Sequence, residues 1–331
     1  MYILRKNSQI EGDFRLDMDD QKDLKLSVII PTYNRVDYLD RCLKYIERQE
    51  HKPLEVLPIV RDYDKLTTDY LKKTNLSINI KPVFLKINYS FVDALNRGME
   101  MASGDIFVFT DDDAFAPSTK WLTVIYDSYK SDDQIAAIGG PVIPFRDDKP
   151  IKQYVNIWGK INWYGKMLGE TTSIPTSVME CDVIRGANMS YRKSVVREFD
   201  KHLLPYWAKN EDAQTFYIKA NGGKIITHPD AYVFHQVAPR VMDRASLETI
   251  FGYSFNSVYI YMRYLPGWKK PFYLIYNFIF MAGDSSGILT FALKLLLLKI
   301  SYIKYRIFKT SILGKISGLL YYLSRHYKYS T

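Results

Sequence analysis

The chain has 331 residues, a net charge of +9 and an aromatic content of 15 %, with no low-complexity tract or internal repeat. This composition excludes a disordered or fibrous protein and fits one large globular domain or two ordinary ones. The two cysteines, Cys42 and Cys181, have no metal-ligand or redox spacing, and the first 25 residues lack the apolar run of a secretory signal. We therefore expect reduced thiols and a cytoplasmic protein.

The alternation of segments predicts the fold class. Short apolar, β-branched runs predict strands at 26–30, 54–60, 78–85, 106–110, 135–143 and 231–235. Helical spacing of apolar residues predicts helices at 36–49, 65–73, 91–102, 121–129 and 212–220. Such alternation favours a doubly wound, mostly parallel α/β sheet, in which ligands bind at the carboxyl ends of the strands.

One predicted strand end is strongly acidic. The run 106–110 leads directly into Asp111, Asp112 and Asp113. Three adjacent carboxylates at the end of a buried strand cost free energy unless a cation or strong donors compensate them. A divalent metal bound with a phosphate-bearing substrate would do so, and the alternative is a solvated acidic turn before the helix that follows Pro117.

Two other strand ends carry polar side chains that we expect to face the same crevice. The first strand is followed by Pro31, Thr32, Tyr33, Asn34 and Arg35, which offer an aromatic face for a base and a guanidinium for phosphate. The second is followed by Asp62, whose carboxylate suits a base or a ribose. For each, the alternative is a turn with a helix cap.

Five segments in this order resemble the family 2 glycosyltransferases, which have the GT-A fold. They are Pro31-Thr32-Tyr33-Asn34-Arg35; Asn88 with 94–98 and 102–105; Asp111-Asp112-Asp113, which resembles the D-x-D motif; 185–192; and Glu211-Asp212, which resembles the E-D motif. The resemblance implies a GT-A domain at 26–240, after an N-terminal extension at 1–25 and before a helical, basic C-terminal region at 241–331.

The resemblance also implies roles for single residues. Those expected to bind the nucleotide sugar are Pro31, Tyr33, Arg35, Asp62, Asn88 and Asp111. Asp113, Asp111 and His235 are expected to hold Mg²⁺ or Mn²⁺. Asp112 is expected to point to the other side of its strand and to matter least, because side chains alternate along a strand.

The acceptor side follows from the same resemblance. Asp212, beside Glu211, is the expected base that takes the proton of the acceptor hydroxyl, and Trp207 and Asn188 are the expected acceptor contacts. Direct displacement predicts inversion at the anomeric carbon. The processive Q-x-x-R-W motif is missing, which predicts one sugar per encounter. The alternatives for Asp212 and for His235 are a helix cap and a structural histidine.

The C-terminal region is basic and apolar together. From Met262 onward there are eleven Lys and Arg residues against one acid, Asp284, and the apolar runs 272–282 and 288–298 fall short of a bilayer-spanning helix. We expect peripheral or monotopic binding to the cytoplasmic face of a membrane, hence a lipid-linked glycan as the acceptor. Helix packing, oligomerisation and a re-entrant hairpin are the alternatives.

Two other function classes fit parts of the sequence. A nucleic-acid-binding protein would explain the basic tail but not the acidic strand end, so we expect no nucleic acid as a partner. A catalytically inactive sugar- or nucleotide-binding relative would keep the fold without needing Asp212.

Overall fold

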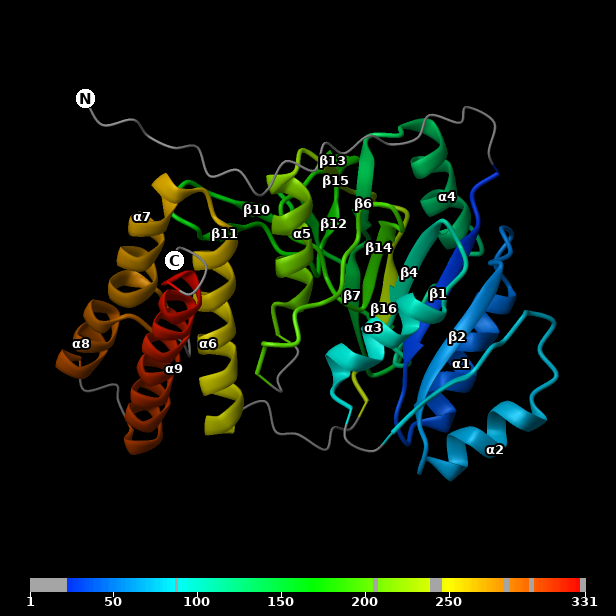
Figure 1. Cartoon of the computed structure of the whole chain (residues 1–331), viewed down its shortest axis with the longest axis horizontal. Helices are drawn as coiled ribbons and strands as arrows, with labels where there is room; N and C mark the ends of the chain where they lie inside the picture. The colour runs from blue at the N-terminus through cyan, green and yellow to red at the C-terminus, as the bar shows by residue number, and fades with distance from the viewer. Residues whose placement is uncertain are drawn as a thin grey trace.

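The computed structural model describes residues 23–86, 89–204, 208–238, 246–282, 286–297 and 301–327. Figure 1 shows a twisted sheet with helices on both faces and, beside it, a group of C-terminal helices. Most of the expected extension at 1–25 lies outside the described residues.

The main sheet has eight strands in the order β13-β15-β6-β14-β4-β1-β2-β3. β1 is parallel to β2 and β4, β15 is parallel to β6, and β14 and β13 run antiparallel to their neighbours. The predicted mostly parallel sheet is therefore confirmed. The strands are β1 Leu26–Pro31, β2 Glu55–Arg61, β3 Val83–Leu85, β4 Ile106–Thr110, β6 Ile135–Gly139, β13 Met179–Glu180, β14 Asn188–Arg192 and β15 Lys224–Thr227.

Helices pack on both faces of this sheet through apolar side chains at helical spacing. Leu39 and Leu43 of α1 share one buried cluster with Trp121 of α4, whereas Leu95 of α3 and Ile218 of α5 belong to the cluster on the other face. This double cover explains why the parallel strands are mostly apolar on both faces. The helices are α1 Val36–Glu47, α2 Lys65–Lys73, α3 Phe91–Met101, α4 Trp121–Ser131 and α5 Asn210–Ala220.

The predicted single strand at 135–143 is wrong, because two strands occupy that run. β6 ends at Gly139, and β7 begins at Val142 in a second sheet of order β5-β16-β7-β8. Gly140 allows the bend, since a Cβ there would overlap the Ala231 carbonyl oxygen. The second sheet contains β5 Ala114–Phe115, β7 Val142–Arg146, β8 Lys149–Pro150 and β16 Val233–His235; short strands follow at β9 Tyr154–Val155, β10 Lys160–Ile161, β11 Met167–Leu168 and β12 Ile174–Pro175.

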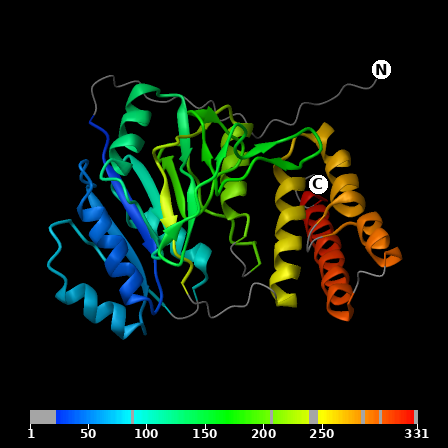
Figure 2. The same cartoon turned by 180° about the vertical axis from the view of Figure 1, so that it is seen from behind.

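The C-terminal region is helical, as predicted, and its two longest helices lie against each other (Figure 2). Gly314 and Gly318 of α9 lie one turn apart, and a Cβ at either would come 2.5 Å from a carbonyl oxygen of α6. Glycine at these positions therefore lets the two helices approach closely. The elements are α6 Leu247–Tyr264, η1 Gly267–Lys269, α7 Lys270–Ile275, the π-helix η2 Tyr276–Phe280, α8 Ile288–Leu296 and α9 Tyr302–Tyr327.

The topology determines where the first turn of α5 lies. β15 is parallel to β6, both run in the same direction as β4, and α5 joins β15 through residues 221–223. Because α5 packs back along β15, its first turn lies at the edge where the parallel strands have their carboxyl ends. Figure 1 shows this turn and those strand ends toward the bottom of the view.

Among the described residues, no helix is both long enough and apolar enough to cross a membrane.

Candidate active site

Asp113 lies where the main sheet, the second sheet and the segment after β16 meet. Its Oδ1 is 3.0 Å from His235 Nε2, and its Oδ2 accepts a hydrogen bond from the Ala238 amide at 2.9 Å. Burial alone would raise the pKa of this carboxyl, but His235, Ala238 and Arg35 hold it below its usual value. The pKa of Asp113 is therefore that of an acid ionised at neutral pH.

Three potential metal ligands converge at this point. Asp111, Asp113 and His235 each offer a ligand atom, and these atoms all lie within 4.8 Å of one another. His235 is the last residue of β16, and Asp113 directly precedes β5, the antiparallel neighbour of β16. The Asp111 side chain follows β4 and is one-third exposed. Two carboxylates and an imidazole, with one ligand facing outward, fit a divalent cation that also contacts a substrate phosphate.

Asp112 was expected to point to the other side of its strand, but it faces the same Arg35 guanidinium as Asp113. It is buried, accepts a hydrogen bond from Thr32 Oγ1 at 2.8 Å and pairs with Arg35 Nη1 at 2.9 Å. The alternation rule does not apply because β4 ends at Thr110 and Asp112 lies in a turn. Burial raises the pKa of Asp112 to about 7, against the opposing charge of Arg35.

Arg35, predicted to bind phosphate, lies against the acidic cluster. Its Nη1 is 2.9 Å from Asp112 and 3.5 Å from Asp113, and its side chain is 29 % exposed. The guanidinium thus compensates two adjacent carboxylates while one side of it remains accessible. That position, at the start of α1 and beside the candidate metal ligands, also suits a diphosphate.

The loop after β1 is attached to the loop after β2. Asn34 has φ 51° and donates its amide hydrogen to Asp64 Oδ2 at 2.7 Å, while Asp64 also caps α2. Tyr33 lies edge-to-face with Tyr63, at 5.6 Å between ring centroids. Asp64, rather than the exposed Asp62, is the acid that joins these two loops.

The two remaining nucleotide-side predictions have different outcomes. Pro31 is the last residue of β1, so its ring lies at the strand end that faces the candidate metal ligands. Asn88 lies outside the described residues.

The candidate base is buried and ion-paired. Asp212 is 3 % exposed in the first turn of α5, and its Oδ2 is 2.7 Å from Lys209 Nζ. Burial disfavours the ammonium, but its interactions with Asp212, Tyr253 and Tyr261 together place the pKa of Lys209 well above its usual value. Burial and the charge of Asp212 also raise the pKa of Glu211 to about 7. Glu211 is thus a weaker acid than an ordinary glutamate.

The structure does not present Asn188 to a ligand, which corrects its expected role as an acceptor contact. The side chain is 2 % exposed; its amide donates to the carbonyls of Pro141 and Ala231, and its Oδ1 accepts from Trp121 Nε1. These bonds join the two sheets. Trp207, the other expected acceptor contact, lies outside the described residues.

The sequence analysis missed Lys209. Its backbone has φ 77°, an unusual conformation for lysine that directs the chain into α5 just before Asp212. The sequence shows that Lys209 is three residues before Asp212, but Lys209 precedes the helix, so the rule for helical pairs does not predict their contact. The burial of the lysine could not be inferred from the sequence either.

Comparison with known proteins identifies relatives of the chain. The family described as glycosyl transferase family 2 matches residues 27–199, more than half of the chain. A glucosyl-dolichyl phosphate glucuronosyltransferase of Haloferax volcanii is 26 % identical over 127 residues, which are 37 % of this chain and 39 % of that protein. A GalNAc(5)-diNAcBac-PP-undecaprenol beta-1,3-glucosyltransferase of Campylobacter jejuni is 33 % identical over 91 residues, 27 % and 29 % of the two chains. The chain thus spans less than half the length of both relatives.

Solved structures support the fold. A mannosyltransferase of Pyrobaculum calidifontis, in complex with GDP-Man and Mn²⁺, aligns with a TM-score of 0.53 at 14 % identity, covering 92 % of this chain and 88 % of that one. This likeness confirms the GT-A fold predicted from the sequence. The family match ends at residue 199, so Asp212 and His235 lie beyond it.

We predict that Asp113→Ala abolishes Mn²⁺ binding in isothermal titration with MnCl₂ alone. Mutating a residue that only supports a metal ligand typically weakens metal binding by up to about 100-fold. Removing a ligand itself should weaken it by more. His235→Ala should weaken it in the same direction. Asp69→Ala, at an exposed acid of α2, is the charge-matched control. Unchanged binding by Asp113→Ala would contradict the assignment.

Proposed function

Because the chain belongs to glycosyl transferase family 2, we propose that it is a metal-dependent, inverting and non-processive glycosyltransferase. It transfers one sugar from a nucleotide-sugar donor to a hydroxyl of a glycan acceptor. The donor half of the site contains Pro31, Tyr33, Arg35 and Asp62, and the cation is Mg²⁺ or Mn²⁺. The relative solved with GDP-Man and Mn²⁺ supports this choice of partners.

One observation carries the proposal: the candidate metal ligands and the candidate base lie at the same edge of the sheet. Asp111 and Asp113 follow β4, and Asp212 lies in the first turn of α5, which packs back along β15. A donor whose diphosphate lies against Arg35 would extend its sugar from the first group toward the second.

Asp212 and Arg35 have different roles in the proposed reaction. Asp212 takes the proton of the acceptor hydroxyl while the hydroxyl oxygen forms its bond to the anomeric carbon. The bond from that carbon to the diphosphate breaks, and the leaving nucleoside diphosphate keeps the electron pair. Arg35 stabilises the negative charge that develops on the diphosphate. A bound divalent cation would stabilise the same charge further. Attack opposite the leaving group inverts the anomeric carbon.

We further propose that the acceptor is lipid-linked and that the C-terminal helices, within 241–331, bind the cytoplasmic surface of a membrane. The names of two relatives include dolichyl phosphate and undecaprenol. The α8–α9 surface exposes large apolar side chains next to basic ones, and the buried thiols of Cys42 and Cys181 fit a reducing compartment. Its members are Leu293, Leu295, Leu296, Leu297, Tyr302, Ile303 and Tyr305, with Lys294, Lys304, Arg306 and Lys309.

We predict metal-dependent turnover from a panel of UDP-, GDP- and dTDP-sugars. With Mn²⁺, the wild-type protein should bind and slowly hydrolyse at least one of them. Asp212→Asn should keep donor binding but lower turnover by about 100-fold or more, because general bases typically contribute that much. Asp69→Asn is the matched control. Donor binding with turnover unaffected by Asp212→Asn would contradict the base, and no binding at all would contradict the enzyme.

We predict that the protein co-sediments with phosphatidylglycerol vesicles and less with phosphatidylcholine vesicles, since each basic residue near an anionic surface contributes about 1 kcal/mol. Salt at about 0.5 M should weaken the binding. Leu296→Glu with Leu297→Glu should abolish it, whereas Leu66→Glu, an equally exposed leucine of α2, should not. Equal loss in both variants, or oligomers without vesicle binding, would contradict the membrane surface.

A further inference from the structure

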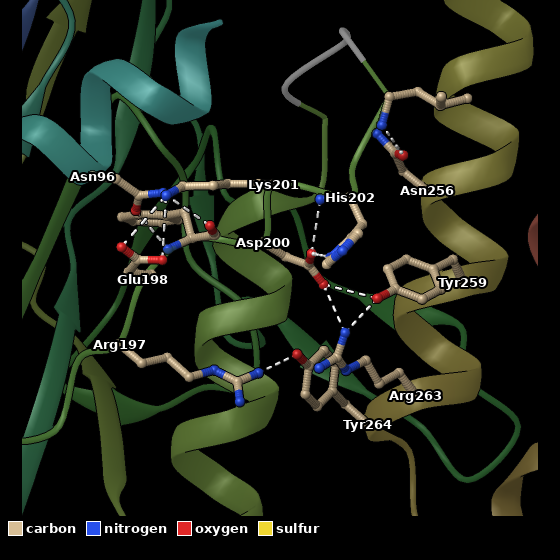
Figure 3. Close-up of polar contacts among 12 residues, drawn as sticks. Asn96, Arg197, Glu198, Asp200, Lys201, His202, Asn256, Tyr259, Arg263 and Tyr264 are labelled. Carbon is tan, nitrogen blue, oxygen red and sulfur yellow. Dashed lines mark hydrogen bonds and ion pairs between the residues drawn. The ribbon is translucent and has the colours of Figure 1, made fainter. Parts of the chain in front are cut away.

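The segment 197–204, which follows β14, is fixed between α3 and α6 (Figure 3). On the α3 side, the Asn96 side chain accepts from the Phe199 amide at 2.7 Å and donates to the Phe199 carbonyl at 3.0 Å. On the α6 side, Asp200 Oδ2 accepts from Tyr259 and from Arg263, each at 2.9 Å. The segment is therefore attached to a helix of the C-terminal region as firmly as to the sheet domain.

Asn256 extends this attachment toward the candidate base. Its Oδ1 accepts from the Leu204 amide at 3.0 Å, and its Nδ2 donates to the Ala208 carbonyl at 3.2 Å. The side chain is fully buried. One amide thus joins two backbone points on either side of residues 205–207, and only a side chain that both accepts and donates can form both bonds.

The second of these points adjoins the base. Ala208 precedes Lys209, whose ammonium bonds Asp212 and lies 5.9 Å and 5.8 Å from the ring centroids of Tyr253 and Tyr261 of α6. Asn256 lies between these two tyrosines in the sequence of the same helix. Helix α6 therefore both bonds the Ala208 carbonyl through Asn256 and packs two tyrosine rings near Lys209, the partner of Asp212.

We propose that Asn256 is a positioning residue for sugar transfer: it fixes the backbone at Leu204 and Ala208, and through Lys209 it sets the place of the Asp212 carboxylate. This inference rests on the proposed function, in which Asp212 is the base. It assigns α6 a part in the acceptor half of the site. Leucine has nearly the same size and would fill the same space, so what the amide adds is the pair of bonds to the Leu204 amide and the Ala208 carbonyl.

The test compares full-length Asn256→Leu and Asn256→Asp with wild type in Mn²⁺-dependent hydrolysis of the UDP-, GDP- and dTDP-sugar panel. Both variants should lower kcat by about 10- to 100-fold, as expected when a reacting group moves by about 1 Å. The KM for the nucleotide sugar should stay within about twofold, since the donor contacts are unchanged. Ser254→Ala, which removes a hydroxyl bonded to Ser311 of α9, is the control and should keep both constants.

Hydrogen exchange distinguishes positioning from a loss of folding. The Leu204 amide should exchange faster in Asn256→Leu but stay protected in Asn256→Asp, which keeps the acceptor oxygen and loses the donor to Ala208. Wild-type kcat in either variant, unchanged Leu204 exchange in Asn256→Leu, or a parallel loss of kcat in Ser254→Ala overturns the inference alone. A wild-type protein that hydrolyses no nucleotide sugar contradicts the proposed function itself, and the inference falls with it.

Discussion

Three adjacent carboxylates at the end of a buried strand are the constraint on which the site depends. Asp112 and Asp113 are each 2 % exposed, so their charges need compensation from nearby groups. Arg35 comes from the start of α1, His235 from the end of β16 and the Ala238 amide from the segment that follows it. Forming this cluster therefore aligns both sheets with the first helix, and the same alignment brings the candidate metal ligands together.

The candidate base is subject to the same constraint, since its buried carboxylate is compensated by one cation, Lys209. Lys209 and Asp212 are both largely buried, and their pairing is enclosed by aromatic rings from α6. Phe216 of α5 also contacts Tyr261 of α6 edge-to-face, at 5.0 Å between centroids. The helix that carries the base is thus supported by the sheet on one side and by the C-terminal helices on the other.

The sequence predicted what depends on local pattern and missed what depends on distant partners. Helix α2 and strand β4 have the predicted bounds, because both depend on local sequence: a continuous apolar run in β4, and in α2 the helical spacing together with the Asp64 cap. Asp112 was misplaced because the turn after Thr110 ends the alternation of side chains. The role of Asn188 depends on Trp121 and Ala231, which reach it from other parts of the chain. The division of 135–143 was visible in its Gly-Gly-Pro sequence, a common breaker.

The most direct test of the account is the position of the metal in crystals grown with Mn²⁺ and GDP or UDP. Anomalous scattering at the manganese edge should give a peak within ligand distance of Asp113 and His235, with the diphosphate between that peak and Arg35. We expect Asp212 to lie on the opposite side of the diphosphate from Arg35, facing the place of the sugar. A manganese peak at Glu211 and Asp212, or a nucleotide bound away from the end of β4, would contradict it.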